Sequence, residues 1–384
     1  MRGPVARGIA ILAAVAATAA IYLLVFREDS DSGRRDRDAG RAEVPKAVRD
    51  LVGELTAEQK VDGILLMGFE GTDSTAPFLD ELRARQLGGL LVREENWLDA
   101  VQGPALIGEL KAAATEDGEI PPLVAAAQEG GEYRSFDDLP PENRQLNIGD
   151  SGDPELAESW AFEAGEALRE AGFDMNLAPI ADVATLDSPL ADRAFSDDEL
   201  ITAQLTAAAI RGCEEAGIAC VARHFPGLGA ASQSTDQGPA TVSLDAETLA
   251  SRDLAPFEAA VAEGAPAVML SHAFYAAYDP VTPGSLTETI ATELLRDGVG
   301  FTGVAMTDDL STGAIRGTSG VATAAVEAVN AGADMLLVSS PDEAANVREA
   351  LLGAADSEEI PADRLDQAVG RVLELKRRYG LLEE

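Results

Sequence analysis

The sequence predicts an α/β fold, a (β/α)8 barrel of the TIM type that one domain forms over residues 49–384. Three observations support this prediction. Eight short apolar runs alternate with segments of helical periodicity, which is typical of parallel strands joined by helices. Several helical segments are followed by glycine just before the next apolar run, as at a helix C-terminus. Polar residues gather directly after the apolar runs, where barrels of this type carry their sites.

The predicted strands are short and aliphatic, and the segments between them have leucine and alanine at helical spacing. The strands are Ile64–Phe69, Gly89–Val92, Leu123–Ala127, Met175–Ala178, Ile218–Ala222, Ala267–Ser271, Gly303–Thr307 and Met335–Ser339. The helices are Pro77–Gln86, Pro104–Thr115, Pro154–Ala171, Ile201–Ala216, Leu254–Glu263, Thr289–Asp297 and Val321–Ala331, with closing helices at Asp342–Ala354 and Arg364–Tyr379. Glycine precedes a strand at Gly88, Gly172, Gly217 and Gly332.

A doubly wound open sheet is the main alternative to the barrel. That fold predicts a glycine-rich phosphate-binding loop after the first strand. Only Gly71 follows the first predicted strand closely, and a single glycine does not make such a loop. The sequence therefore favours the barrel.

The first 48 residues differ from the rest of the chain. Residues 9–26 are free of charge and about as long as a helix that crosses a bilayer. Arg2 and Arg7 precede this run, so the positive-inside rule places residues 1–8 in the cytoplasm and the barrel outside it. A cleaved signal peptide is the alternative, and the length of the run favours an uncleaved anchor. Residues 27–48 are predicted to be a flexible, acidic and polar linker. We therefore expect a single-pass protein of the cell membrane with an extracytoplasmic barrel.

The chain is strongly acidic, with 67 Asp and Glu against 29 Lys and Arg and a formal net charge of -38. A polyanion repels nucleic acid and anionic lipid headgroups, so neither is an expected partner of the barrel. With two histidines, two cysteines and no His/Cys cluster, the sequence predicts no metal site and no other cofactor.

The two cysteines, Cys213 and Cys220, flank a short turn between a predicted helix and a predicted strand. A disulfide would need their Cα atoms within about 7 Å of each other. Two small buried apolar side chains are the favoured interpretation, because free cysteine is among the most buried residue types.

Polar residues follow five of the predicted strands. They are Gln128-Glu129-Gly130-Gly131 after the third strand, Asp182 and then Asp192-Arg193 after the fourth, Arg223-His224 after the fifth, Ser271-His272 after the sixth and Asp308-Asp309 after the seventh. Because the C-terminal ends of barrel strands meet at one face, these residues are expected to line one polar pocket. Carboxylates with cations and without a phosphate-binding loop fit cleavage of a glycosidic bond. A lyase or an isomerase would fit the same residue types.

At these residues the chain resembles glycoside hydrolase family 3, in particular its single-domain bacterial β-N-acetylglucosaminidases of cell-wall turnover. The resemblance covers residues 51 to 382. The matching motifs are Gln128-Glu129-Gly130-Gly131, Leu177-Ala178-Pro179-Ile180-Ala181-Asp182-Val183, Asp192-Arg193-Ala194-Phe195, Arg223-His224-Phe225-Pro226-Gly227 and Thr307-Asp308-Asp309-Leu310. Their order and spacing agree with the family, which implies a barrel fold and a carbohydrate substrate.

The resemblance also implies roles for individual residues. Asp308 stands at the position of the catalytic nucleophile. The sugar-binding positions of the family are occupied by Arg193, Arg223 and His224. Two further residues are candidates for substrate contacts: Arg134, which lies beside the position of another family arginine, and His272 at the end of the sixth strand.

Several positions depart from the family pattern. Ala127 stands where the family has an aspartate that holds sugar hydroxyls, Ser135 replaces an arginine, and Arg223 replaces a lysine. The single-domain branch carries Asp-Ser-His in the loop after the fifth strand, and its histidine is the general acid/base. Ser234, Thr235 and Asp236 occupy those positions here, so the histidine is missing.

Two hypotheses follow. In the first, the chain is a retaining β-N-acetylhexosaminidase-type exo-glycosidase of cell-wall or extracellular glycans, with Asp308 as nucleophile and Asp236 as proton donor. The two carboxyls must then lie about 5–5.5 Å apart, and the donor needs a raised pKa, as burial or the charge of its neighbour would give it. In the second, the barrel is an inactive, membrane-tethered module that binds a glycan or a partner protein. The sequence favours the first narrowly, with weak activity.

Overall fold

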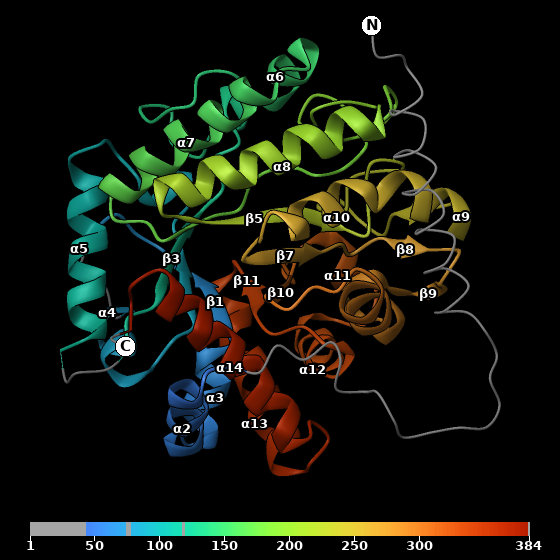
Figure 1. Ribbon diagram of the computed structural model, residues 1–384. Coiled ribbons are helices and arrows are strands. Elements are labelled where there is room, and N and C mark those ends of the chain that lie inside the picture. The colour runs from blue at the N-terminus through green and yellow to red at the C-terminus, as the bar shows by residue number, and fades with distance from the viewer. Residues whose placement is uncertain (1–43, 74–77, 117–119, 383–384) are drawn as a thin grey trace, which may run out of the picture.

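Eight short strands form one sheet: β1 (Leu65–Gly68), β2 (Gly89–Leu91), β3 (Leu123–Ala126), β4 (Met175–Asn176), β5 (Ala219–Phe225), β7 (Ala267–Leu270), β10 (Val304–Thr307) and β11 (Leu336–Val338). The sheet order is β10-β7-β5-β4-β3-β2-β1-β11, and the paired strands are parallel. A parallel bridge between Met306 and Met335 joins the two edge strands, so the sheet curls into a nearly closed barrel (Figure 1). This computed structural model describes residues 44–73, 78–116 and 120–382. The predicted barrel and its eight strands are confirmed.

Helices surround the barrel and connect its strands (Figure 1). They are α4 (Phe78–Ala84), α5 (Gln102–Ala114), α7 (Pro154–Glu170), α8 (Glu199–Ala216), α10 (Ala255–Ala262), the π-helical η5 (Thr289–Gly298), α12 (Val321–Ala331), α13 (Pro341–Asp356) and α14 (Ala362–Arg378). The start of α8 is fixed by Asp198, whose carboxylate accepts hydrogen bonds from two backbone N–H groups of the first turn. Its end is fixed by Gly217, whose φ of 73° suits glycine.

Smaller elements that the sequence did not predict complete the fold. They are α2 (Lys46–Glu54), α3 (Ala57–Gly63), η1 (Glu94–Asn96), η2 (Gly131–Tyr133), α6 (Gln145–Ser151), β6 (Thr241–Val242), α9 (Ala246–Thr248), η3 (Leu249–Asp253), β8 (Phe274–Tyr275), β9 (Asp279–Pro283), η4 (Gly284–Leu286) and α11 (Gly313–Arg316). The strands β6, β8 and β9 form a separate three-stranded sheet. Because α2 begins at Lys46, the predicted linker, 27–48, is helical in its last three residues.

Three predicted segments lie outside the described residues: the cytoplasmic segment, 1–8, the anchor, 9–26, and residues 27–43 of the linker. Within the part of the chain that the structure describes, no helix is both long and apolar enough to cross a membrane.

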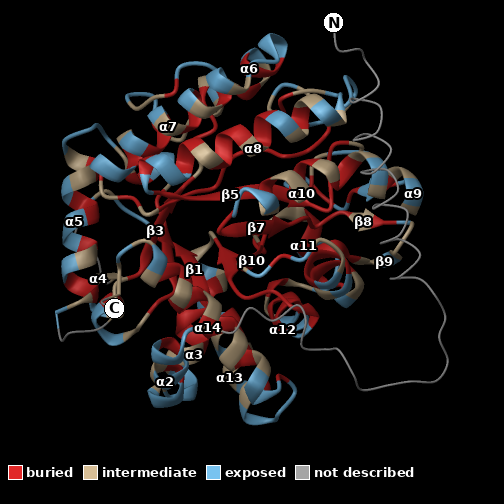
Figure 2. Ribbon diagram, in the orientation of Figure 1, coloured by how far each residue is buried: buried red, intermediate tan, exposed pale blue. Residues whose placement is uncertain are grey.

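The core has two layers, one on each side of the strands, because side chains alternate across a strand. The eight strands of the barrel are buried along their whole length (Figure 2). The inner layer fills the barrel with aliphatic and Met side chains, among them Leu66, Met175, Val221, Met269, Met306 and Leu337. At the N-terminal ends of the strands, Val372 and Leu375 of α14 join this inner cluster and close the barrel from below.

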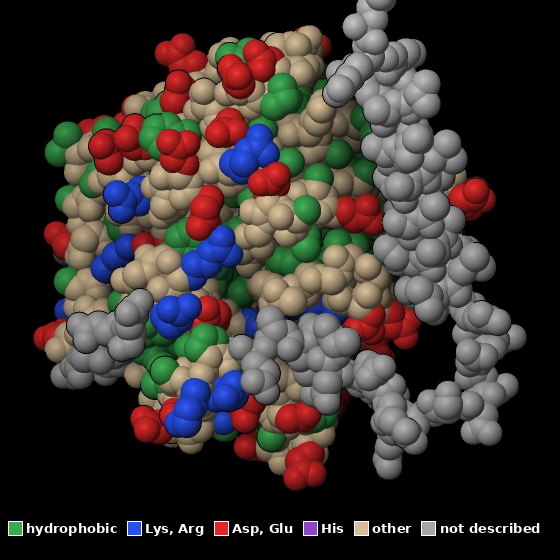
Figure 3. Space-filling model, in the orientation of Figure 1, with side chains coloured by type: hydrophobic (Ala, Val, Ile, Leu, Met, Phe, Trp, Pro, Cys, Tyr) green, Lys and Arg blue, Asp and Glu red, His purple; other side chains and the backbone are tan. Residues whose placement is uncertain are grey.

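The acidic surface is mixed rather than concentrated. On the face seen in Figure 3, acidic side chains lie over many elements, with Lys and Arg side chains between them. Such a surface keeps a protein of net charge -38 well solvated and disfavours polyanionic partners.

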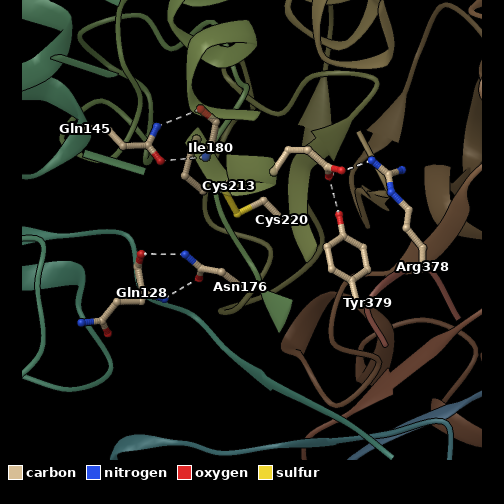
Figure 4. The surroundings of a disulfide bond; sticks show 9 residues. Gln128, Gln145, Asn176, Ile180, Cys213, Cys220, Arg378 and Tyr379 are labelled. Atoms are coloured by element: carbon tan, nitrogen blue, oxygen red, sulfur yellow. Dashed lines mark hydrogen bonds and ion pairs between the residues drawn. A yellow bond between two sulfur atoms is a disulfide. The ribbon is translucent and has the colours of Figure 1, made fainter. Parts of the chain in front are cut away.

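Cys213 of α8 and Cys220 of β5 form a disulfide, with their Cα atoms 6.0 Å apart (Figure 4). The prediction of two unlinked apolar side chains was wrong. The chain reverses at Gly217 in the left-handed conformation, which brings the last turn of α8 beside the start of β5. The disulfide therefore ties an outer helix to the strand that carries Arg223 and His224.

Candidate active site

Asp308 directly follows β10, at the C-terminal end of the barrel, and only 8% of it is exposed. Its Oδ1 accepts the backbone N–H of Asp309 at 2.8 Å, and its own N–H donates to Leu270 at 3.0 Å. Burial would raise the pKa of this carboxyl, but His224, His272 and the N–H of Asp309 together lower it. A fixed carboxylate that stays ionised suits a nucleophile.

Glu129, after β3, organises the two arginines predicted to bind sugar. Its carboxylate accepts two hydrogen bonds from Arg193, at 2.8 and 2.6 Å, and a further one from Nη2 of Arg223. Burial opposes ionisation of Glu129, but the two guanidinium groups lower its pKa. The arginines are thus held by a buried carboxylate, which limits their rotation.

Arg193 also interacts electrostatically with carboxylates other than that of Glu129. Burial would lower the pKa of Arg193, but Glu129, Asp236 and Asp308 raise it above its ordinary value. Arg223 in turn helps to lower the pKa of Asp308. The structure therefore brings Asp308, Arg193 and Arg223 into one electrostatic cluster at the barrel mouth, as the sequence predicted.

His224 belongs to the same cluster and lies on a bulge. The register of β5 against β7 shifts between Arg223 and Phe225, and such bulges change the direction of side chains. His224 is 4% exposed, and its Nδ1 lies 2.9 Å from Oδ2 of Asp182. Asp182 also accepts the backbone N–H groups of His224 and Leu228, so it fixes the turn.

Gln128 has a supporting role one residue before Glu129. Its backbone N–H donates to Oδ1 of Asn176, and Nδ2 of Asn176 donates back to its carbonyl (Figure 4). Its side-chain Nε2 donates to three carbonyl groups of the following loop. These bonds anchor the loop after β3 and thereby place Glu129.

Asp236, the predicted proton donor, lies in an exposed position on the loop after β5. Oδ2 of its carboxylate accepts a hydrogen bond from the Ser234 hydroxyl at 3.2 Å. The backbone of the loop is fixed, because Gly313 donates to the carbonyl of Asp236 at 3.0 Å. Asp236 thus contributes to the field at Arg193 but lacks the burial expected of a proton donor.

Arg134 and His272 are placed differently from the expectation. Arg134 donates to the carbonyls of Gly131 and Leu139, so it stabilises its own loop. His272 is fully buried, with Nδ1 2.7 Å from the Ser285 hydroxyl, and its Nε2 has no hydrogen-bond partner among the described residues. Burial lowers the pKa of His272 although Asp308 and Asp309 act against it. Its imidazole thus lies within the electrostatic influence of the carboxylates of Asp308 and Asp309.

Two positions that depart from the family pattern contact each other. The carbonyl of Ala127, at the end of β3, accepts the backbone N–H and the hydroxyl of Ser135, at 3.2 and 2.8 Å. Ser135 thus supports the loop backbone with its side chain.

The sequence did not assign Glu129 the role of holding both arginines, although the Gln128-Glu129-Gly130-Gly131 motif pointed to this loop. It also missed the contact between Ser285 and His272, because these residues are separated by the small sheet. No group of three or more His, Cys, Asp or Glu side chains could hold a metal ion within the described ranges.

Sequence comparison gives a consistent set of relatives. The family described as "Glycosyl hydrolase family 3 N terminal domain" matches residues 56–375. A β-hexosaminidase of Xylella fastidiosa (strain M12) is 35% identical over 298 residues, which cover 76% of this chain and 87% of that protein. A β-hexosaminidase of Stenotrophomonas maltophilia (strain K279a) is 32% identical over 287 residues, or 73% and 84% of the two chains.

Solved structures show the same similarity. A glycoside hydrolase family 3 β-N-acetylglucosaminidase from Paenibacillus sp. str. FPU-7 superposes with a TM-score of 0.81 at 33% identity, covering 85% of this chain and 63% of that longer chain. A β-N-acetylhexosaminidase from Beutenbergia cavernae DSM 12333 superposes with a TM-score of 0.74 at 31% identity, covering 83% and 98%.

Proposed function

Since this chain belongs to glycoside hydrolase family 3 and is a hydrolase of glycosidic bonds, we propose that it is a retaining exo-β-N-acetylhexosaminidase. The proposed substrate is a glycan that ends in β-linked N-acetylglucosamine or a related sugar. One observation carries the proposal above all: Asp308 is a buried carboxylate whose pKa is held down by His224, His272 and Asp309 against the effect of burial. The names of the relatives support the choice of sugar.

The proposed reaction has two displacements. In the first, an oxygen of Asp308 bonds to the anomeric carbon while the bond to the leaving oxygen breaks and that oxygen takes a proton. In the second, the oxygen of water bonds to the anomeric carbon while the bond to Asp308 breaks, and the water gives up a proton to the group that supplied the first one. Arg193, Arg223 and His224 orient the sugar beside Asp308, because their side chains are held by Glu129 and Asp182.

We assign the proton donor to Asp236. Its carboxyl is exposed to solvent and bonded to the Ser234 hydroxyl instead of being enclosed in the pocket, so it is expected to deliver a proton to the leaving oxygen inefficiently. The rate should therefore depend strongly on the leaving group, because a good leaving group needs little protonation. Weak turnover of natural glycans follows from the same reasoning.

Kinetics with two aryl N-acetyl-β-glucosaminides test the proposal. The full chain should cleave the 2,4-dinitrophenyl glycoside far faster than the phenyl glycoside and should give the β-anomer first by NMR. Asp308→Asn should abolish both reactions. In the parent protein, mass spectrometry of peptides should find a glycosyl adduct at Asp308. Asp192→Asn is the matched control, since Asp192 lies in the same region with a side chain that is 66% exposed. Turnover by Asp308→Asn at the parent rate would refute the proposed nucleophile.

We further propose that the protein is anchored by residues 9–26 with the barrel outside the cytoplasm. The apolar run supports this location, and the buried disulfide between Cys213 and Cys220 is typical of an oxidising compartment. Protease treatment of intact cells should remove the barrel if this location is right. A barrel protected until the cells are lysed would contradict it.

An inactive glycan-binding module is the second candidate. It is favoured by the exposure of Asp236 and by Ala127, which has no carboxylate at the position where the family carries an aspartate. This function predicts that N-acetylglucosamine oligosaccharides bind without being cleaved and that Arg193→Ala weakens their binding. An adduct on Asp308 would decide against it.

A further inference from the structure

A cavity of about 290 Å³ lies at the N-terminal end of the barrel, opposite the end that carries Asp308. Its wall includes Thr302, shortly before β10, and Pro266, directly before β7. Helix α14 contributes Arg371 and Arg378. The volume lies at the lower limit of the range of roughly 300–1,000 Å³ that is usual for small-molecule sites, so the cavity suits a small ion or a compact group.

Arg371 belongs to a buried group of charges, here called the basic cluster, which consists of Arg296, Arg364, Arg371 and Asp334. One carboxylate oxygen of the fully buried Asp334 accepts Nη1 of Arg371 at 2.8 Å and Nη2 of Arg364 at 2.9 Å. The other oxygen accepts Nη2 of Arg296 and the backbone N–H of Ala305. Three guanidinium groups thus share one carboxylate, which leaves an excess of two positive charges in the basic cluster.

The other charged side chains at the cavity are already paired with opposite charges. Glu374 accepts two hydrogen bonds from Arg377, at 2.8 and 2.7 Å, and Arg378 is paired with Glu214 at 2.8 Å. These two pairs add no net charge, so the excess comes from the basic cluster. Of the three arginines in that cluster, Arg371 is the one that lines the cavity.

Repulsion between the arginines is a cost that a bound anion would relieve. Burial lowers the pKa of Arg296 to about 10; Asp334 opposes this effect, and the charges of Arg371 and Arg364 add to it. Asp334 engages Nη1 of Arg371, and no other hydrogen bond of this side chain is found within the described ranges. Its Nε and Nη2 groups therefore remain for a ligand, and a guanidinium binds an oxyanion through two parallel N–H bonds.

We propose that this cavity binds a small oxyanion of the phosphate or sulfate class, with Arg371 as its main ligand. A doubly charged oxyanion balances the excess charge of the basic cluster, which a neutral sugar does not. The bound anion contacts α14 and the residues before β10 together, so it stabilises the N-terminal end of the barrel. In a chain of net charge -38, a locally positive cavity is a selective place for such an anion.

Calorimetric titration of the full chain with inorganic phosphate tests the site. The parent should bind one phosphate per chain. Thr302→Glu adds a carboxylate to the lining at an exposed residue, and like-charge repulsion should weaken phosphate binding at least tenfold. Thr302→Gln is the matched control, since it has the same length without the charge, and it should bind as the parent does. Arg371→Gln should also weaken binding at least tenfold, because it removes a charged donor.

Thermal melts give a second readout. Phosphate should raise the Tm of the parent more than sodium chloride of equal ionic strength does, because a ligand that binds only the folded state stabilises it. This difference should vanish in Thr302→Glu and persist in Arg348→Gln, whose arginine pairs with another buried carboxylate, Asp62, and does not line the cavity.

No heat of phosphate binding in the parent, or equal affinities in Thr302→Glu and Thr302→Gln, would overturn the site. If Arg371→Gln does not fold, the two Thr302 variants still decide the question. None of these measurements uses cleavage of a glycoside, so their result is independent of the proposed function.

Discussion

Asp182 contacts both the side chain and the backbone of His224. Its Oδ2 lies 2.9 Å from Nδ1 of the imidazole and 3.1 Å from the backbone nitrogen of the same residue. A carboxylate accepts hydrogen bonds, so Nδ1 of His224 is the donor in this contact. The orientation of the His224 ring is therefore set by Asp182.

Asp182→Asn should lower kcat/KM on an aryl glycoside by about 10- to 100-fold, because a hydrogen bond to a charged group contributes about 1.5–3 kcal/mol. The amide keeps the shape of the side chain but cannot accept at both positions with the same strength. Asp192→Asn, at an exposed side chain, is the control. Equal kcat/KM in parent and Asp182→Asn would show that the His224 orientation does not matter for the reaction.

Glu129→Gln should destabilise the barrel strongly. The substitution leaves Arg193 and Arg223 without their shared carboxylate, and breaking a buried ion pair costs about 3–5 kcal/mol. Urea denaturation gives the free energy of unfolding. Glu132→Gln removes a pair with Arg144 in which the Glu132 side chain is 60% exposed, so its effect should be about 0–1 kcal/mol. Similar losses in the two variants would contradict the structural role of Glu129.

Asp253, at the end of η3, should make stability depend on pH between about 4 and 7. Burial raises its pKa to about 7, with Asp182 and Glu199 adding to the shift and Arg252 opposing it. The folded state thus binds the proton more tightly than the unfolded chain, so this contribution is present at low pH and is lost as pH rises through 7. The loss is on the order of 4 kcal/mol, at 1.36 kcal/mol per pKa unit.

Asp253→Asn should remove this dependence, because the amide resembles the protonated acid. Free energies of unfolding measured from pH 4 to pH 8 should therefore fall less steeply in the variant than in the parent. Asp297→Asn is the control, because Asp297 is exposed whereas Asp253 is buried. Parallel profiles for parent and Asp253→Asn would mean that Asp253 is ionised in the folded protein throughout.

Replacing both cysteines, as in Cys213→Ala with Cys220→Ala, should lower the free energy of unfolding by about 2–3 kcal/mol, the usual contribution of a short disulfide loop. Adding a reductant should lower the stability of the parent and leave the double variant unchanged. Thermal melts in both conditions measure this. If complete reduction of the disulfide left the melting temperature of the parent unchanged, a stabilising role of the disulfide would be contradicted.

The sequence predicted the strands well because each is a short aliphatic run buried on both faces, a pattern that depends little on distant contacts. The site was predicted in part for a related reason. Asp308, Arg223 and His224 follow strands directly, so the barrel topology alone brings them together. Arg193 also joined the cluster, but only the Glu129 contact explains how a residue in a long loop is held there.

The errors concern residues whose position depends on loop geometry. Arg134 was assigned to substrate through its neighbour in the sequence, yet the local loop turns its guanidinium toward carbonyl groups. The disulfide was missed because a separation of seven residues says nothing about the direction of the chain. A left-handed glycine between helix and strand was the available signal, since it reverses the chain within a few residues.

Helix α14 closes the N-terminal end of the barrel, and it comes later in the chain than all eight barrel strands. During synthesis all eight strands leave the ribosome before Val372 and Leu375 do. Until Val372 and Leu375 pack against the inner cluster, its Met and Leu side chains remain exposed to water at the N-terminal end of the barrel. The nascent protein is therefore most prone to aggregation late in translation, when all eight strands have been made but α14 has not yet closed the N-terminal end of the barrel.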